Sequence, residues 1–206
     1  MSDSLHAMLL SGGTGDPFDR NVLACAIASG FAPPDRLLTD TLALSLTDLR
    51  LLMETLFPHA LGLLDVHPPW RGPQADEPEE PDLRALLFEG RTPGGDPTMA
   101  RWLARIITRR SLGGAHLWED MGLPSRAHLG RLMERHFAPL AARNPGMRWK
   151  KFFYRTLCER DGVLLCKAPN CEVCEDYALC FVPEEMPPHM APPPRPGPGA
   201  GGAALV

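Results

Sequence analysis

Outside one short stretch, the chain of 206 residues contains little cysteine. Four of its six cysteines fall between residues 166 and 180, in CKAPNCEVCEDYALC, so the other 191 residues hold only two. The chain also lacks any run of the roughly 18 to 20 apolar residues that a membrane helix needs. No basic segment precedes the few apolar positions of residues 1–15, so we expect no secretion signal. We therefore expect a cytoplasmic protein that does not contact a membrane, in which clustered cysteines stay reduced.

Sequence motifs for phosphate binding and for catalysis are also missing. The glycine-rich stretch SGGTG, residues 11–15, has no Lys-Ser or Lys-Thr after it and no strand before it, which excludes a phosphate-binding loop. Three histidines lie in the middle of the chain, but no Asp or Glu stands in a motif position beside them. We therefore predict a protein that is not an enzyme, and we interpret these histidines as satisfied or surface groups: His116, His128 and His136.

The net charge of −4 conceals an uneven distribution along the chain. Residues 1–100 carry 6 Lys and Arg against 15 Asp and Glu, whereas residues 101–155 carry 12 against 3, a local net charge of +9. Such a basic stretch directly before a cysteine cluster indicates either an anionic partner or pairing with the acidic half of the same chain. A solvated helical face that pairs with the acidic half is the simpler interpretation.

Amphipathic patterns between helix start and stop signals predict a mainly α-helical fold. Asp16-Pro17 and Asp96-Pro97 each give an N-cap followed by proline at the first helical position. The helix after Asp16 contains Cys25, which we interpret as a small buried hydrophobe. The helix after Asp96 has a core stripe and, on its other face, several arginines. Further helices are expected from Thr47 to Pro58, from His116 to Met121, after Ser125, and from Pro145 to Gly162.

We expect one helical domain over residues 16–183, preceded by a flexible N-terminus at residues 1–15. Residues 65–82 are acidic and rich in proline, which predicts a surface loop inside that domain. Residues 166–180 predict an irregular, cysteine-rich metal-binding loop near the C-terminus. Residues 184–206 are nearly all Pro, Gly and Ala and cannot bury enough side chain to fold, so we predict a disordered tail.

The four clustered cysteines have the spacing Cys166-x4-Cys171-x2-Cys174-x5-Cys180. Thiolates are soft donors, and four of them select zinc or an iron-sulfur cluster. Structural zinc sites usually pair two C-x2-C knuckles across a longer insert, whereas only one such pair is present here. An x4 spacing followed by x2 favours an iron-sulfur cluster, without excluding zinc. Cys158, eight residues before the cluster, is interpreted as buried rather than as a ligand.

Cations precede the cysteines on the last predicted helix. Four thiolates leave a bound cluster with a net negative charge, and Lys150, Lys151 or Arg155 would lower the cost of holding it partly out of water. The same cations could attract an oxyanion.

The stretch RWKKFFYRTLCERDGVLLCKAPNCEVCEDYALCFVPEE, residues 148–185, resembles the NifQ family of nitrogen-fixation proteins. The signature of that family is C-x4-C-x2-C-x5-C behind a basic aromatic helix, and residues 116–147 are also similar. The resemblance covers about residues 20–183. It implies that Cys166, Cys171, Cys174 and Cys180 bind an iron-sulfur cluster that takes up molybdenum, supplied as molybdate. It also implies delivery of that molybdenum to the proteins that assemble the iron-molybdenum cofactor of nitrogenase, among them a scaffold and nitrogenase reductase.

Two other functions fit parts of the sequence. The segment HLWEDMGLPSRAHLGRLMERH has a helix, a glycine-containing turn and a second helix with Arg126, Arg131 and Arg135, as in a helix-turn-helix DNA-binding regulator with a metal sensor. The acidic remainder of the chain argues against a nucleic-acid partner. The third alternative is a helical interaction module stabilised by zinc on the four cysteines.

Overall fold

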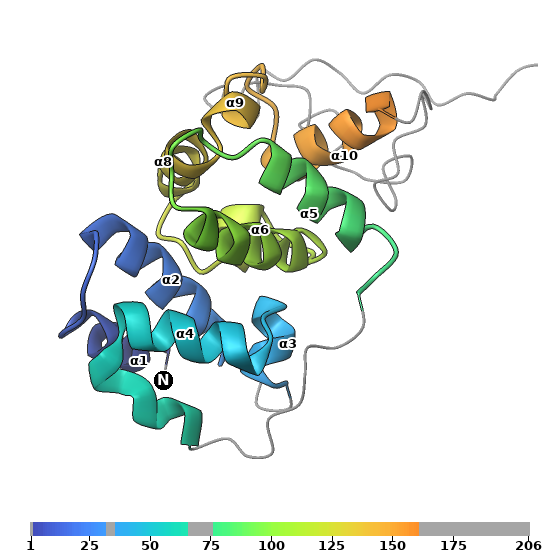
Figure 1. Cartoon of the computed structure of the whole chain (residues 1–206). Coiled ribbons are helices and arrows are strands. Elements are labelled where there is room, and N and C mark those ends of the chain that lie inside the picture. The colour runs from blue at the N-terminus through green and yellow to red at the C-terminus, as the bar shows by residue number, and fades with distance from the viewer. Residues whose placement is uncertain (1, 32–35, 66–75, 161–206) are drawn as a thin grey trace, which may run out of the picture. The chain divides into compact units, whose positions relative to one another are not determined.

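The computed structural model describes residues 2–31, 36–65 and 76–160 (Figure 1). The regular elements of these residues are all helices, which confirms the mainly helical fold. No helix among them has both the length and the apolar character needed to cross a membrane. The sequence predicts a single domain over residues 16–183, and the structure divides the chain into two compact units, Met1–Arg143 and Asn144–Val206. The cysteine loop and the tail lie outside the described residues and stay predictions.

The first unit consists of short helices that follow one another along the chain. Helix α2 contacts α1 and α3, helix α6 contacts α3, α5 and α7, and α7, α8 and α9 contact one another in chain order. The elements of this unit are α1 (Ser2–Leu10), α2 (Pro17–Gly30), α3 (Leu38–Leu42), α4 (Leu46–Leu56), the 3-10 helix η1 (Pro58–Asp65), α5 (Glu80–Glu89), α6 (Pro97–Ser111), α7 (Leu117–Asp120), α8 (Arg126–His136) and α9 (Ala138–Ala141).

Side-chain caps start the helices that the sequence predicted best. The carboxylate of Asp16 accepts hydrogen bonds from the backbone N–H groups of Phe18 and Asp19 at 2.9 and 3.1 Å, and Pro17 follows at the first helical position. Asp96 caps α6 in the same way. Each cap satisfies N–H groups that have no partner inside the helix. Both predicted starts are confirmed, whereas α4 begins one residue before Thr47, with Ser45 as its cap.

Helix α6 contributes one apolar face to the core of the first unit. The predicted stripe of this helix is buried, with every member at most 7 % exposed: Met99, Trp102, Leu103, Ile106 and Ile107. One apolar face of α4 is buried as well: Leu49, Leu52, Met53 and Leu56. Burial of one face of each helix supplies most of the stability that helices this short cannot supply alone.

Two segments differ from the sequence predictions. The N-terminus, predicted to be flexible, forms helix α1, whose Leu9 is fully buried. Its stability comes from packing on α2 and from a hydrogen bond between His59 Nε2 and the carbonyl oxygen of Met8 at 3.1 Å, which local patterns do not reveal. In the predicted loop at 65–82, Asp65 is the last residue of η1, and residues 80–82 belong to α5, which begins at Glu80.

A threonine outside both helices joins α8 to α9. The hydroxyl of Thr92 donates to the carbonyl oxygen of Arg135 at 2.8 Å and accepts from the backbone N–H of Ala138 at 3.0 Å. The backbone N–H of Thr92 donates to the carbonyl oxygen of His136 at 2.8 Å. One residue therefore satisfies the end of α8 and the start of α9.

The second unit is described over residues 144–160, which contain helix α10 (Trp149–Arg160). The turn before it is closed by Asn144, whose side chain accepts from the backbone N–H of Met147 at 2.8 Å and donates to its carbonyl oxygen at 3.0 Å. The helix buries Phe152, Phe153 and Leu157, whereas Trp149 at its start is half-buried.

Candidate metal centre

The four cysteines predicted to bind metal lie outside the described residues: Cys166, Cys171, Cys174 and Cys180. The structure describes the helix that leads to them, α10, which ends at Arg160, six residues before the first of these cysteines. This helix carries four cations against one carboxylate, that of Glu159, so its net charge is +3. The described part of the second unit therefore has a net positive charge just before the predicted ligands in the sequence.

Helix α10 has a buried aromatic face, and its charged side chains differ in exposure: Arg155, Glu159 and Arg160 are exposed, Lys150 is half-buried and Lys151 is buried. The ring of Trp149 lies edge-on to Phe152 with centroids 6.0 Å apart, and it lies 5.8 Å from Phe153. Cys158 is 4 % exposed, which confirms the prediction that it is buried. Arg155 pairs with Glu159 one turn later at 2.7 Å, and both side chains are 56 % exposed.

In the first unit, the basic segment pairs with the acidic half of the chain. Arg109 on α6 makes two hydrogen bonds to the carboxylate of Glu80 on α5, at 2.7 and 3.0 Å, and a third to the carbonyl oxygen of Asp40 at 3.2 Å. Glu80 is fully buried and the side chain of Arg109 is only 14 % exposed. Pairing with the acidic half is confirmed here, but the expected solvated face is wrong for this arginine, because its partners lie inside the fold.

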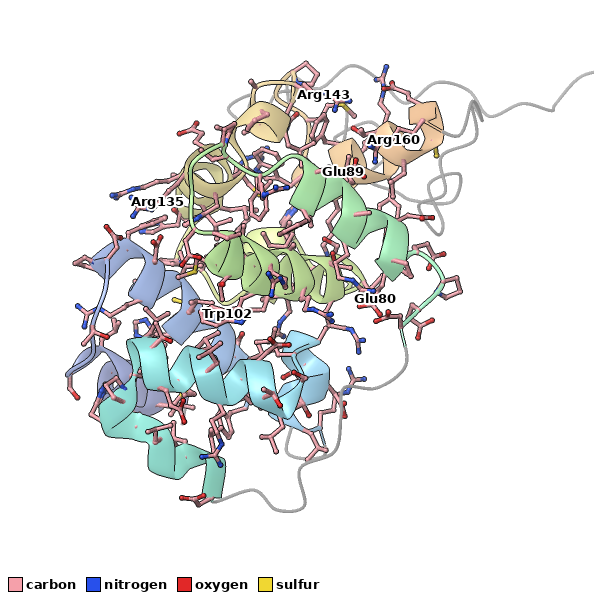
Figure 2. The ribbon with its side chains drawn as sticks, in the orientation of Figure 1. Glu80, Glu89, Trp102, Arg135, Arg143 and Arg160 are labelled. Atoms are coloured by element: carbon pink, nitrogen blue, oxygen red, sulfur yellow. The ribbon has the colours of Figure 1, made fainter. Side chains whose placement is uncertain are left out.

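A second pairing joins α8 to the start of α2. His136 Nε2 lies 2.8 Å from a carboxylate oxygen of Asp19, and Arg135 contacts Asp19 at 3.0 Å and Asp16 at 3.0 Å. Burial by itself would raise the pKa of Asp19, but the hydrogen bonds and charges of His136 and Arg135 outweigh it and lower that pKa below its usual value of 3.8. The Glu80 and Arg135 clusters lie apart on the first unit (Figure 2).

Other arginines of α6 bind backbone carbonyl groups. Arg110 donates to the carbonyl oxygen of Ala26 at 3.1 Å, and Arg105 donates to that of Ala43 at 3.4 Å. Burial lowers the pKa of Arg110 to about 10, although the carboxylate of Asp120 opposes this effect. Arg110 still carries its charge at neutral pH. These side chains hold helices together rather than forming a basic surface.

The helix-turn-helix interpretation loses its basis in this geometry. Helix α7, which would be the first helix of the motif, has only four residues. On the second helix, α8, Arg135 pairs with Asp16 and Asp19, and the guanidinium of Arg131 lies 4.2 Å from the ring centroid of Phe18. Both arginines are on the surface but already interact with side chains of α2, which makes them less available to DNA phosphates.

The histidines agree with their interpretation as satisfied or surface groups. His136 is paired with Asp19, and His128 Nδ1 lies 2.9 Å from the hydroxyl of Ser125. His116 is exposed, and its backbone N–H donates to the carboxylate of Glu119 at 2.9 Å.

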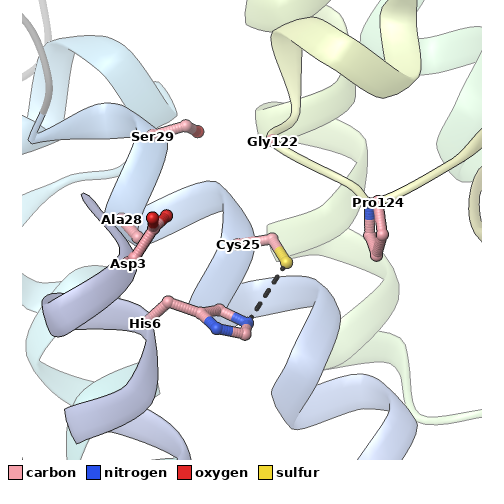
Figure 3. Close-up of a pocket in the computed structure, with 7 residues that line it drawn as sticks. All are labelled: Asp3, His6, Cys25, Ala28, Ser29, Gly122 and Pro124. Atoms are coloured by element: carbon pink, nitrogen blue, oxygen red, sulfur yellow. Dashed lines mark hydrogen bonds between the residues drawn. The ribbon is translucent and has the colours of Figure 1, made fainter.

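A small pocket that the sequence did not predict lies between α1, α2 and the loop after α7 (Figure 3). Its volume is about 210 Å³, and Cys25 and His6 line it with Sγ and Nε2 3.4 Å apart. Cys25 is buried, as predicted, and burial raises its pKa to about 11, so the group is a thiol at neutral pH. No local signal could have found the pair, because its members are 19 residues apart and meet only when α1 packs on α2.

Comparison with known proteins identifies one family. A family model described as NifQ matches residues 22–182, a range that contains all four clustered cysteines. Protein NifQ of Rhodobacter capsulatus is 43 % identical over 159 residues, which cover 76 % of this chain and 82 % of the relative. The Protein NifQ homolog of Sinorhizobium fredii is 38 % identical over 172 residues, which cover 80 % and 72 %.

Protein NifQ of Azotobacter vinelandii is 50 % identical over 107 residues. This alignment covers 52 % of the chain and 53 % of the relative, so the chain spans about half of that protein. No solved structure matches the chain.

Proposed function

Because the chain belongs to the NifQ family, we propose that it receives molybdenum and donates it for assembly of the iron-molybdenum cofactor of nitrogenase. The observation that carries this proposal is that the family match, residues 22–182, spans the whole Cys166-x4-Cys171-x2-Cys174-x5-Cys180 pattern. In this proposal the protein is a carrier and not an enzyme. It acts in the cytoplasm, where reducing conditions keep the four sulfurs as ligands.

The donor set suits an iron-sulfur cluster. Four thiols within fifteen residues give soft ligands of the kind that iron-sulfur clusters use, and Cys166, Cys171, Cys174 and Cys180 would hold it. Such a cluster supplies sulfide that can bind molybdenum. The part of the protein itself is to keep the four thiolates together on one segment and to leave the metal accessible for transfer, which favours a loop over a closed zinc cage.

The charge of α10 supports molybdate as the incoming form of the cargo. Molybdate is a dianion, and the helix just before the cysteines has a net charge of +3. This net charge already counts Glu159, which pairs with Arg155. We propose that Lys150, Lys151 and Arg155 help to attract molybdate. This role fails if replacing the two lysines by glutamine leaves both metal loading and molybdate uptake unchanged.

Metal analysis of protein purified without oxygen tests the proposal. We expect iron and sulfide in the native chain, added molybdenum after exposure to molybdate, and loss of iron in Cys171→Ala. The matched control is Cys158→Ala, which removes a buried cysteine from α10 and is expected to keep its iron. Zinc without iron or sulfide would contradict the proposal and favour the zinc-stabilised module.

Donation is tested by an assembly mixture that contains the cofactor scaffold and nitrogenase reductase but no other molybdenum. The loaded native chain is expected to support cofactor formation, and the Cys171→Ala chain treated in the same way is not. Equal cofactor formation with both chains would rule out molybdenum transfer through these cysteines.

A further inference from the structure

The pocket between α1 and α2 contains two metal-ligating groups that the proposed function does not use. His6 on α1 points toward Cys25 on α2, and Asp3 and Ser29 also line the pocket (Figure 3). Gly122, in the loop after α7, completes the wall, and any Cβ there would approach the carbonyl oxygen of Cys25 to 2.9 Å. The glycine therefore allows this loop to lie directly against α2.

We propose that Cys25 and His6 form a second metal site, for a borderline-soft divalent ion such as Zn²⁺. In tetrahedral zinc sites, Zn–S is about 2.3 Å and Zn–N about 2.0 to 2.1 Å, so a sulfur and a nitrogen ligand lie about 3.5 Å apart. The Sγ and Nε2 atoms share a hydrogen bond in the structure and are separated by 3.4 Å. Both donors therefore already lie at the spacing of two ligands on one ion, and thiolate with imidazole is a donor pair typical of zinc.

The protein supplies two ligands, and the pocket leaves room for the others. Among the described residues, no group of three or more His, Cys, Asp or Glu side chains is arranged to hold a metal. The pocket volume is about 210 Å³, whereas one water takes up about 30 Å³ in the liquid, so water molecules or a small anion can complete the coordination. A site with two protein ligands exchanges its ion more readily than a structural site with four.

Binding of the metal ion would replace a hydrogen bond of His6 and the thiol proton of Cys25 by bonds to the metal. His6 Nε2 also lies 3.1 Å from Asn21 Oδ1, and an ion on this nitrogen replaces that hydrogen bond. The thiol of Cys25 loses its proton to solvent as the metal–sulfur bond forms. Because one ligand comes from α1 and the other from α2, the bound ion ties the N-terminal helix to the rest of the first unit.

Cobalt titration of the full chain tests the site once the four motif cysteines are replaced by serine. We expect one Co²⁺ per chain with thiolate-to-cobalt absorption, and displacement of this Co²⁺ by Zn²⁺. Even loss of an outer partner of a metal ligand typically costs about 10- to 100-fold in affinity, so His6→Gln is expected to weaken binding by at least about tenfold. Cys25→Ala should remove the absorption, and alanine suits this position because Ala24 and Ala26 flank it in α2.

The matched control is Cys158→Ala in the same background, which removes the other buried cysteine and should leave the cobalt absorption unchanged. Absence of the absorption, or its persistence in both Cys25→Ala and His6→Gln, would overturn the site. If Cys25→Ala does not fold, His6→Gln decides alone. Because the motif cysteines are absent from every sample, this result is independent of the iron and molybdenum analyses.

Discussion

Glu80 and Asp19 both accept hydrogen bonds from arginines of the basic segment, but water reaches the two clusters very differently. Glu80 is fully buried, and its partner Arg109 is only 14 % exposed. The Asp19 side chain is 11 % exposed and its partner Arg135 is 40 % exposed. In a dry site an unpaired charge is expensive, whereas in a wet site solvent replaces much of a lost partner. The two clusters should therefore respond differently to the same kind of substitution.

The largest loss of folding stability is expected from Glu80→Gln. This change leaves the guanidinium of Arg109 buried without its counter-charge, which typically costs about 3 to 5 kcal/mol of unfolding free energy. Urea unfolding followed by circular dichroism measures the loss. Glu79→Gln, one residue earlier, is the control and should stay within about 0.5 kcal/mol of the native chain. A loss below about 1 kcal/mol for Glu80→Gln would show that solvent reaches this pair after all.

A smaller loss of folding stability, which depends on pH, is expected from Asp19→Asn. The change removes charge-assisted hydrogen bonds from His136 and Arg135, worth about 2 kcal/mol together at neutral pH. The pKa of Asp19 is lower in the folded chain than its usual 3.8, so its contribution is complete above that value and is lost as the pH falls through the lower, folded pKa.

The stability difference between the native chain and Asp19→Asn should therefore shrink as unfolding is measured from pH 7 down toward pH 3. Asp82→Asn, an exposed carboxylate in the first turn of α5, serves as the comparison and should change stability little. A difference that stays constant over this pH range would contradict the lowered pKa of Asp19.

The smallest loss of folding stability is expected from Arg155→Gln on α10. Its pair with Glu159 is exposed on both sides, and such i,i+4 pairs contribute about 0.3 to 0.5 kcal/mol. Thermal unfolding in low and high salt measures it, and added salt should remove the difference. A loss larger than about 1 kcal/mol would mean that Arg155 has a structural role beyond this surface pair.

Local signals in the sequence were sufficient to predict most of the helices. Asp16-Pro17 and Asp96-Pro97 start α2 and α6 as predicted, because a cap and the proline that follows it depend only on adjacent residues. The buried face of α6 also followed from periodicity alone. Helix α1 was missed because its stability depends on packing against α2 rather than on its own composition.

Long-range partners could not be predicted in this way. The charge count indicated that the basic segment pairs with the acidic half, but not that Arg109 would pair with Glu80, 29 residues earlier, or Arg135 with Asp19, 116 residues earlier. The Cys25–His6 pair was missed for the same reason. The cysteine spacing is different, because the four predicted ligands lie within fifteen residues and predicting them requires no tertiary structure.

The hydroxyl of Thr92 helps to position Arg135, the partner of two carboxylates at the start of α2. It bonds to the carbonyl oxygen of Arg135, the residue whose side chain contacts Asp16 and Asp19. A methyl group in place of this hydroxyl, as in Thr92→Val, would keep the shape but leave the end of α8 held only by the hydrogen bond from the Thr92 N–H to His136. The two carboxylates at the start of α2 would then lose the steady position of their partner, so a residue 73 positions away sets how firmly Asp19 is held.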